Sequence, residues 1–153
     1  FYNCKNLTRV FIPANVKVID NDAFNGCDKL ETLAILGDLQ EIGDRAFKNC
    51  LSLIQLEIPK TVTSIGEEVF FGCTEMQAVE IPKSVQFIGK ATFNDCSKLK
   101  VINFKNRTDI TSLGREWFPN GGEYREYVNK DTYVVQNLPE FPLTREEMLS
   151  AFF

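Results

Sequence analysis

The pentapeptide AFNGC at residues 23–27 recurs in recognisable form as AFKNC at 46–50, VFFGC at 69–73 and TFNDC at 92–96. Each copy begins 23 residues after the one before it, and a phenylalanine and a cysteine keep their places in every copy. A fixed period of this length is typical of a solenoid, because one coil cannot bury its apolar face alone and stacked coils form a continuous core. The sequence therefore predicts a protein built from stacked coils.

Other apolar residues keep the same period. If equivalent positions of successive coils lie over one another, each of these series becomes a column in the core. The columns with one residue type throughout are Phe1, Phe24, Phe47, Phe70 and Phe93; Cys4, Cys27, Cys50, Cys73 and Cys96; and Ile19, Ile42, Ile65 and Ile88.

Each unit contains the spacing L-x-x-L-x-L, which predicts a short strand with alternate side chains turned inward. A proline such as Pro59 ends this strand, since it has no backbone N–H to donate. A glycine such as Gly66 follows the isoleucine that recurs every 23 residues. This glycine is expected to make a tight corner with positive φ. The A-F-x-x-C segment is expected to form a single helical or 3₁₀ turn on the opposite side, with the phenylalanine in the core.

Two units depart from the pattern. The second reads ILGDLQEIG at 35–43 and lacks the proline, and the fifth contains a two-residue insertion. In the fifth unit Trp117 replaces a small residue, and its bulk is expected to close the end of the core. We therefore expect a solenoid of about five coils over residues 1–121, beginning within a repeat and so truncated at its N-terminal end, and a capping segment over 122–153.

The capping segment has its own signals. EYREYV at 123–128 and TYVV at 132–135 flank Asn129, Lys130 and Asp131, which predicts a β-hairpin. Thr144 and Glu147 have the spacing of a helix capping box, so a short C-terminal helix is expected to follow.

The stretch LIQLEIPKTVTSIGEEVFFGC, residues 53–73, resembles the BspA-like (type 5) leucine-rich repeat in its Ile-Pro, its Ile-Gly and its Phe-x-x-Cys. The resemblance implies an α/β solenoid: a right-handed coil of 23-residue repeats, with a concave parallel β-sheet and short helical or 3₁₀ turns opposite. A parallel β-helix, as in polysaccharide lyases, is the main alternative with this period, but it does not need one Phe-x-x-Cys turn per coil.

The cysteines are expected to pack rather than react. Stacked coils lie about 4.8 Å apart, so distance alone does not exclude disulfides. An odd number of cysteines at equivalent inward positions favours a column of buried thiols. On packing alone, Cys50→Ser should destabilise more than Cys50→Ala. Because the chain has no histidine and no C-x-x-C spacing, the sequence predicts no metal site, no cofactor and no Ser-His-Asp or Cys-His catalysis.

Charge and hydropathy limit the partners. The net charge is −4, and the sequence has no basic stripe of the kind that neutralises phosphates, which disfavours nucleic acid. No run of 18 or more apolar residues is present, so no membrane span is predicted.

The outward strand positions form two variable columns, and we interpret them as a candidate binding surface on the concave sheet. Phe11 is the most suggestive member, being apolar and outward. Phe71 and Phe87 are aromatic in otherwise mixed columns elsewhere. The candidate binding residues are Arg9, Phe11, Thr32, Gln55, Glu57, Glu80 and Asn103; Ala34, Ala78 and Val101 complete the two columns.

Glu57 and Glu80 occupy equivalent positions in adjacent units. One coil's rise would bring their carboxylates near the separation of about 5 Å found in retaining glycosidases. Any repeated acid in a solenoid has this geometry, so a solvated face is the simpler interpretation and a β-helix carbohydrate enzyme is the third alternative.

The sequence thus predicts a non-enzymatic module that binds a protein or glycan ligand through its concave face. The family resemblance implies adhesion, a cell-surface or secreted location, and a host matrix or cell-surface protein as a partner. The alternative is a docking or accessory domain of a larger enzyme or effector whose catalytic part lies outside these residues.

Overall fold

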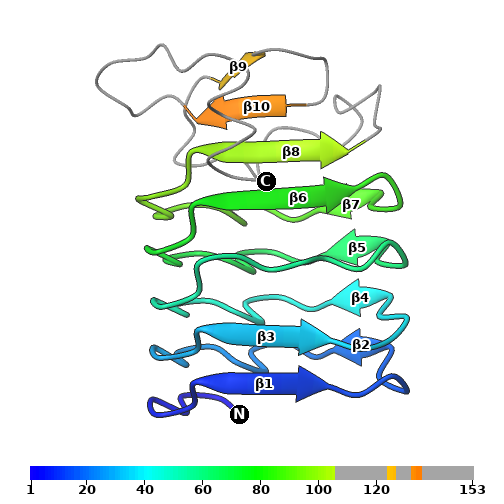
Figure 1. The fold of residues 1–153 in the computed structure, drawn as a ribbon, viewed down its shortest axis with the longest axis vertical. Helices are drawn as coiled ribbons and strands as arrows, with labels where there is room; N and C mark the ends of the chain where they lie inside the picture. The colour runs from blue at the N-terminus through cyan, green and yellow to red at the C-terminus, as the bar shows by residue number, and fades with distance from the viewer. Residues whose placement is uncertain (106–123, 127–131, 136–153) are drawn as a thin grey trace.

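Successive coils of the chain lie directly over one another in the computed structural model, which describes residues 1–105, 124–126 and 132–135 (Figure 1). Strand partners are one repeat apart: Arg9 pairs with Thr32, and Ile42 pairs with Ile65. We call the coils one to four in chain order, with coil one at residues 7–29, coil two at 30–52, coil three at 53–75 and coil four at 76–98. The long strands are β1 (Arg9–Ile12) in coil one, β3 (Thr32–Ile35) in coil two, β6 (Ala78–Pro82) in coil four and β8 (Val101–Lys105) after it.

The long strands form one side of the solenoid, which we call the long-strand face. Their pairing is parallel within β1–β3 and within β6–β8. Coil three has no long strand, and only the single bridge between Glu57 and Glu80 connects it to β6. The predicted parallel sheet is therefore present, but it is divided into two parts.

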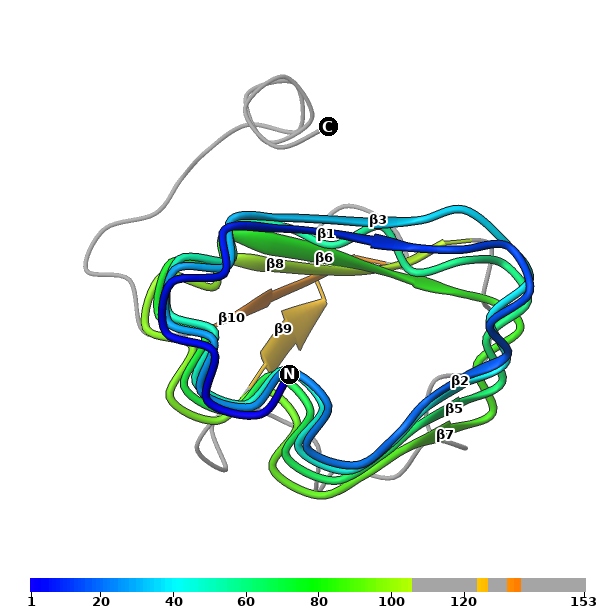
Figure 2. The same cartoon turned by 90° about the horizontal axis from the view of Figure 1, so that it is seen from below.

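A second parallel sheet lies on the opposite side of each coil, as the view along the stack shows (Figure 2). One residue of each strand is a buried isoleucine, so the Ile column of the sequence fills this wall of the core. The repeat pattern predicted that these residues turn inward but gave no sign of a second sheet. Its strands are β2 (Val18–Ile19), β4 (Glu41–Ile42), β5 (Ser64–Ile65) and β7 (Phe87–Ile88).

The A-F-x-x-C segments form turns, and the expected helical or 3₁₀ turns are absent from residues 1–105. Backbone amides alternate in direction along the segment. The N–H of Cys27 donates within its own coil to the carbonyl of Phe24, whereas the N–H of Phe24 donates to the next coil, at Ala46. Asp22 and Gly26 have positive φ, which interrupts any helical path. The prediction of helical or 3₁₀ turns was wrong because every second backbone amide of this segment donates its hydrogen bond to the next coil.

The prediction of positive φ at the Ile-Gly glycines is also wrong. The positive-φ glycines of the described coils are Gly26 and Gly72. At Gly66 the limitation is space, because a Cβ atom there would lie 2.7 Å from the backbone nitrogen of Asp44 in the preceding coil. Glycine is therefore required at this corner for the close stacking of two backbones rather than for a left-handed conformation.

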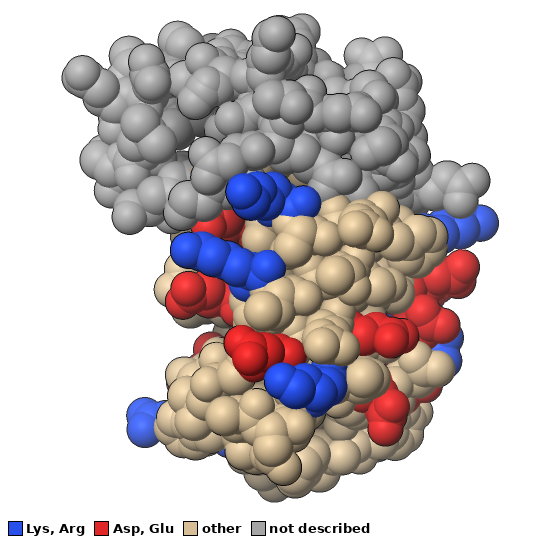
Figure 3. All heavy atoms as spheres, turned by 90° about the vertical axis from the view of Figure 1, so that its right-hand side faces the viewer, with Lys and Arg blue, Asp and Glu red and all other residues tan. Residues whose placement is uncertain are grey.

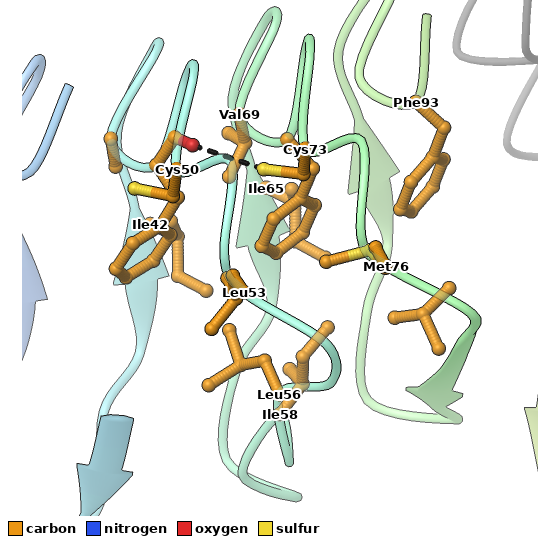
Figure 4. Close-up of a cluster of buried hydrophobic side chains, with 14 of the residues drawn as sticks. Ile42, Cys50, Leu53, Leu56, Ile58, Ile65, Val69, Cys73, Met76 and Phe93 are labelled. Atoms are coloured by element: carbon orange, nitrogen blue, oxygen red, sulfur yellow. Dashed lines mark hydrogen bonds between the residues drawn. The ribbon is translucent and has the colours of Figure 1, made fainter. Parts of the chain in front are cut away.

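The core consists of the predicted columns. Phenylalanine rings stack from Phe1 to Phe93, with centroids 5.4–5.8 Å apart and interplanar angles of 2–12°. Phe47, Phe70 and Phe93 are fully buried, and the neighbouring aliphatic and cysteine side chains fill the space around them (Figure 4). The predicted register of like side chains through the interior is confirmed.

Two strands of the C-terminal region are described. β9 (Tyr124–Glu126) pairs antiparallel with β10 (Thr132–Val135), as the predicted hairpin requires, and β10 pairs antiparallel with β8. The division of the chain at residue 121 stays a prediction. The cap at Trp117 and the helix expected after Thr144 lie outside the described residues. No helix in the described part of the chain is long and apolar enough to cross a membrane.

Candidate binding surface

The cysteine column is part of the core and makes a regular set of hydrogen bonds. Each of the four inner thiols donates to the phenylalanine carbonyl of the preceding coil, as Cys73 does to Phe47 in Figure 4. All five cysteines are free thiols. The four bonds run from Cys27 to Phe1, Cys50 to Phe24 and Cys73 to Phe47, each 3.2 Å, and from Cys96 to Phe70, 3.1 Å.

Burial suppresses the reactivity of these thiols. It raises the pKa of Cys50 and of Cys96 to about 12, and it raises the pKa of Cys73 well above its usual value. A thiol with such a pKa is protonated at neutral pH, and the protonated form is a poor nucleophile. The structure thus supports packing as the role of this column.

The predicted surface residues do lie on one face. Register places Arg9 beside Thr32, and Glu80 beside both Glu57 and Asn103. Gln55 lies in coil three, two residues before Glu57, and is exposed. Phe11 is 66% exposed and pairs with Ala34. Whether these residues bind a ligand stays a prediction, but the long-strand face does bring them together.

Val101 is an exception to the predicted outward columns. Its side chain is only 2% exposed, whereas Ala78, its partner on β6, is partly exposed. On its other side Val101 pairs with Val134 of β10. The addition of β10 to the sheet was not predicted, and Asn103, two residues after Val101 on β8, stays partly exposed.

The exposed side chains of the long-strand face change from mainly apolar to acidic along the stack. Apolar groups dominate coils one and two, where Phe11 is joined by Leu36, which is 64% exposed. Carboxylates follow at Glu57 and Glu80. Figure 3 shows the adjoining side, on which the long strands end: an uncharged area lies at its middle, bordered by acidic and basic groups. A partner that covers coils one to four would thus meet an apolar half and an acidic half.

Leu36 and Ile54 are surface residues that sequence analysis did not select. Leu36 stands where other coils have proline, and Ile54, 47% exposed, stands in a column that is otherwise polar. A comparison of each outward column for apolar exceptions would have identified both residues.

Glu57 and Glu80 are register partners across coils three and four. Both lie on the long-strand face, where Glu57 is exposed and Glu80 is partly exposed. Their proximity follows from the repeat period itself and adds no specific support for the glycosidase alternative.

The turn side of the solenoid has most of its charges paired between coils. Asp22 accepts two hydrogen bonds from Arg45, at 3.0 and 2.9 Å, and the hydrogen bond from Arg45 lowers the pKa of Asp22. Lys48 lies 2.6 Å from Glu68 and 4.6 Å from the centroid of the Phe71 ring. Phe71, noted in the sequence as an aromatic exception, therefore has a partner within the molecule.

Within residues 1–105, no group of three or more acidic or cysteine side chains is arranged to hold a metal ion.

Parallel coils at a 23-residue period, with a phenylalanine stack and a thiol ladder, define a leucine-rich repeat solenoid. The sequence profile of the BspA type leucine rich repeat region matches residues 1–123 in six copies. The chain belongs to the BspA-type leucine-rich repeat family.

Two solved structures support this assignment. A leucine-rich repeat protein of T. pallidum is 39% identical, with a TM-score of 0.66; the match covers 68% of this chain and 49% of that one. A leucine-rich repeat protein from Bacteroides ovatus is 28% identical, with a TM-score of 0.65, covering 78% of this chain and 31% of that one. The chain thus spans half or less of the length of these relatives. No curated protein matches the sequence.

Proposed function

We propose that this solenoid is a non-enzymatic binding module that engages a protein or glycan through its long-strand face. Proteins of this fold generally serve as protein-binding scaffolds, and repeat proteins of this class are typically not catalytic. One observation carries the proposal. The buried columns are nearly invariant and hold the coils in register, whereas the outward columns vary along the stack, as in the series Phe11, Ala34, Glu57, Glu80 and Asn103.

Adhesion is the finer form of the proposal. Members of this family are typically surface or secreted proteins of bacteria, which supports a cell-surface or secreted location and a host matrix or cell-surface protein as the partner. The exposed apolar half of the face suits a protein ligand best, because buried apolar contacts commonly provide the anchors of protein interfaces.

The test uses a matched pair of phenylalanines. Phe11 is 66% exposed on β1 in the long-strand face, and Phe87 is 54% exposed on β7 in the opposite sheet. Phe11→Ser and Phe87→Ser therefore remove the same side chain at similar exposure from opposite sides. Biolayer interferometry should be run with both variants against a panel of extracellular-matrix proteins and immobilised glycans.

We expect a ligand from this panel to bind the parent chain and to lose affinity about tenfold or more with Phe11→Ser but not with Phe87→Ser. Equal effects of both variants, or loss with Phe87→Ser alone, would exclude the long-strand face. If no protein or glycan of the panel binds the parent chain, the adhesive form of the proposal is contradicted.

A further inference from the structure

The long-strand face is interrupted between coils two and three. β1 and β3 form a separate two-stranded sheet, and β6 begins the other sheet. No backbone hydrogen bond joins β3 (Thr32–Ile35) to residues 54–58 in this described part of the chain. On the opposite side the same two coils remain paired, through β4 and β5. The interruption is thus local to the long-strand face.

The second unit's departure from the repeat pattern explains why β3 is held on one side only. Leu36 replaces the proline of other coils, and its N–H donates to the carbonyl of Ile12 in coil one at 3.0 Å. Gly37 follows, and a Cβ atom there would lie 2.3 Å from the carbonyl oxygen of Ala14. Only glycine permits this approach, so the end of β3 is pinned to coil one.

The register identifies which backbone N–H and C=O groups of β3 do not bond to coil one. In a parallel ladder, alternate residues of a strand bond to the neighbour on each side. Thr32 and Leu36 donate to coil one. Leu33 and Ile35 therefore direct their N–H and C=O groups toward coil three, where the described residues offer them no backbone partner. Unpaired groups in a row are a template for an additional strand.

The surroundings of this open edge indicate which side chains an added strand would carry. Leu36 and Ile54, at 64% and 47% exposure, flank it with aliphatic surface. β3 is the outermost of the labelled long strands when the stack is viewed along its axis (Figure 2). An added strand would consequently lie over coil three, against the exposed Glu57. Covering that carboxylate is costly unless a cation pairs with it.

We propose that the open edge of β3 binds an extended peptide segment of the partner, which adds as a strand. The segment alternates aliphatic residues, which contact Leu36 and Ile54, with lysine or arginine, one of which pairs with Glu57. Strand addition provides affinity through the main chain, and the side chains provide selectivity. This inference rests on the proposed function, since it specifies how the long-strand face recognises a protein.

The probe is a blocked peptide of alternating valine and lysine, roughly eight residues long. It is longer than the four residues of β3, so it can span the whole edge. Hydrogen exchange followed by NMR on the complete chain gives the readout. Without peptide, the amides of Leu33 and Ile35 should exchange faster than those of Ala34 and Leu36, which face coil one. With peptide, Leu33 and Ile35 should gain protection while the other two are unchanged.

Two comparisons test the chemistry. The same peptide with alternate backbone nitrogens methylated should bind more than about tenfold more weakly, because it cannot complete the ladder. Glu57→Gln should weaken binding of the valine–lysine peptide about fivefold, the size of one exposed ion pair. Glu67→Gln, an exposed acid next to the second sheet, is the matched control and should leave binding unchanged.

Failure of this inference is distinguishable from failure of the proposed function. Absence of peptide binding, equal binding of the methylated peptide, or protection outside Leu33 and Ile35 would overturn strand addition. If Phe11→Ser still abolishes binding of a macromolecular ligand in that case, the long-strand face binds through side chains alone. If the peptide binds as described and no macromolecular ligand is found, the adhesive proposal fails instead.

Discussion

A thiol that donates to a carbonyl is the smallest repeated contact of this solenoid. Cys50 donates to Phe24, and Thr92, in the neighbouring column of small residues, donates to the carbonyls of Gly66 and Gly89 while fully buried. The core therefore accommodates a buried hydroxyl at Thr92, where carbonyls are within reach. The sequence showed the burial of the cysteines but not their acceptors, because the acceptor lies 26 residues earlier and only the stacked register brings it close.

This contact changes the expected ranking of substitutions at Cys50. Cys50→Ala should lower the free energy of unfolding by about 1–3 kcal/mol through lost packing. Cys50→Ser loses similar volume, but its hydroxyl can donate to Phe24, so we now expect it to cost no more than alanine. Urea denaturation of both variants under reducing conditions measures this. A clearly larger loss with serine would mean that the carbonyl of Phe24 does not serve as its acceptor.

Asp22 connects coils through its charge. Its pKa is lowered by Arg45, so the pair stabilises the folded state above the unfolded value of 3.8 and loses this effect as pH falls through the lower folded value. Asp22→Asn keeps a residue suited to its φ of 58°. The melting temperature of the variant should be lower than that of the parent at pH 5–7, and the difference should vanish near pH 2.

Asp38→Asn is the control for this prediction. The Asp38 side chain is 76% exposed and 3.8 Å from Lys17, so its removal should change the melting temperature little at any pH. A difference between Asp22→Asn and the parent that persists unchanged at pH 2 would contradict an electrostatic origin.

At the scale of elements, periodicity predicted the strands better than the turns. Inward and outward alternation located β1, β3, β6 and β8 because it reports burial directly. The same pattern predicted a strand at Leu53–Ile58 in coil three, and that prediction was wrong, since only the bridge at Glu57 forms there. The A-F-x-x-C segment has an i, i+3 spacing that a helix would also produce. Two features prevent a helix here: residues with positive φ, such as Asp22 and Arg45, and backbone amides that donate to the next coil. Neither feature can be recognised from the sequence of a single unit.

The Ile-Gly corner gives a sharp test of coil-to-coil contact. Gly66→Ala places a Cβ atom 2.7 Å from the backbone nitrogen of Asp44, and a backbone atom cannot rotate away as a side chain can. We expect a loss of at least about 2 kcal/mol in the free energy of unfolding. Glu67→Ala, the adjacent exposed position, should stay within about 0.5 kcal/mol in the same urea titration. Equal stabilities of the two variants would show that the coils separate easily at this corner.

At the scale of the whole molecule, the candidate surface was only partly predictable. The two outward columns follow from alternation within a unit, so Arg9, Phe11 and Glu57 were identified correctly as exposed. The open edge of β3 depends on which strands pair, and that pairing involves the contact of Leu36 with coil one. Neither this pairing nor the burial of Val101 can be read from the repeat pattern of a single unit.

The thiol ladder also sets the response of the whole solenoid to alkaline pH. Burial raises the pKa of Cys50 from 9.0 to about 12, and Cys27, Cys73 and Cys96 are raised as well. Between pH 9 and 12 the unfolded chain has released the protons of Cys50, Cys73 and Cys96, and the folded chain has not. Unfolding then releases protons, so stability falls as pH rises.

Each buried thiol should contribute a decrease of about 1.4 kcal/mol per pH unit in this window. Lysines and tyrosines also titrate there, but they are the same in the parent and in Cys50→Ala. The free energy of unfolding should therefore fall less steeply in Cys50→Ala, by about that amount per pH unit between pH 9.5 and 10.5. Urea denaturation with reductant measures both slopes. Parallel slopes would mean that the Cys50 thiol is as free to ionise in the folded solenoid as in the unfolded chain, which a stacked and dry core does not allow.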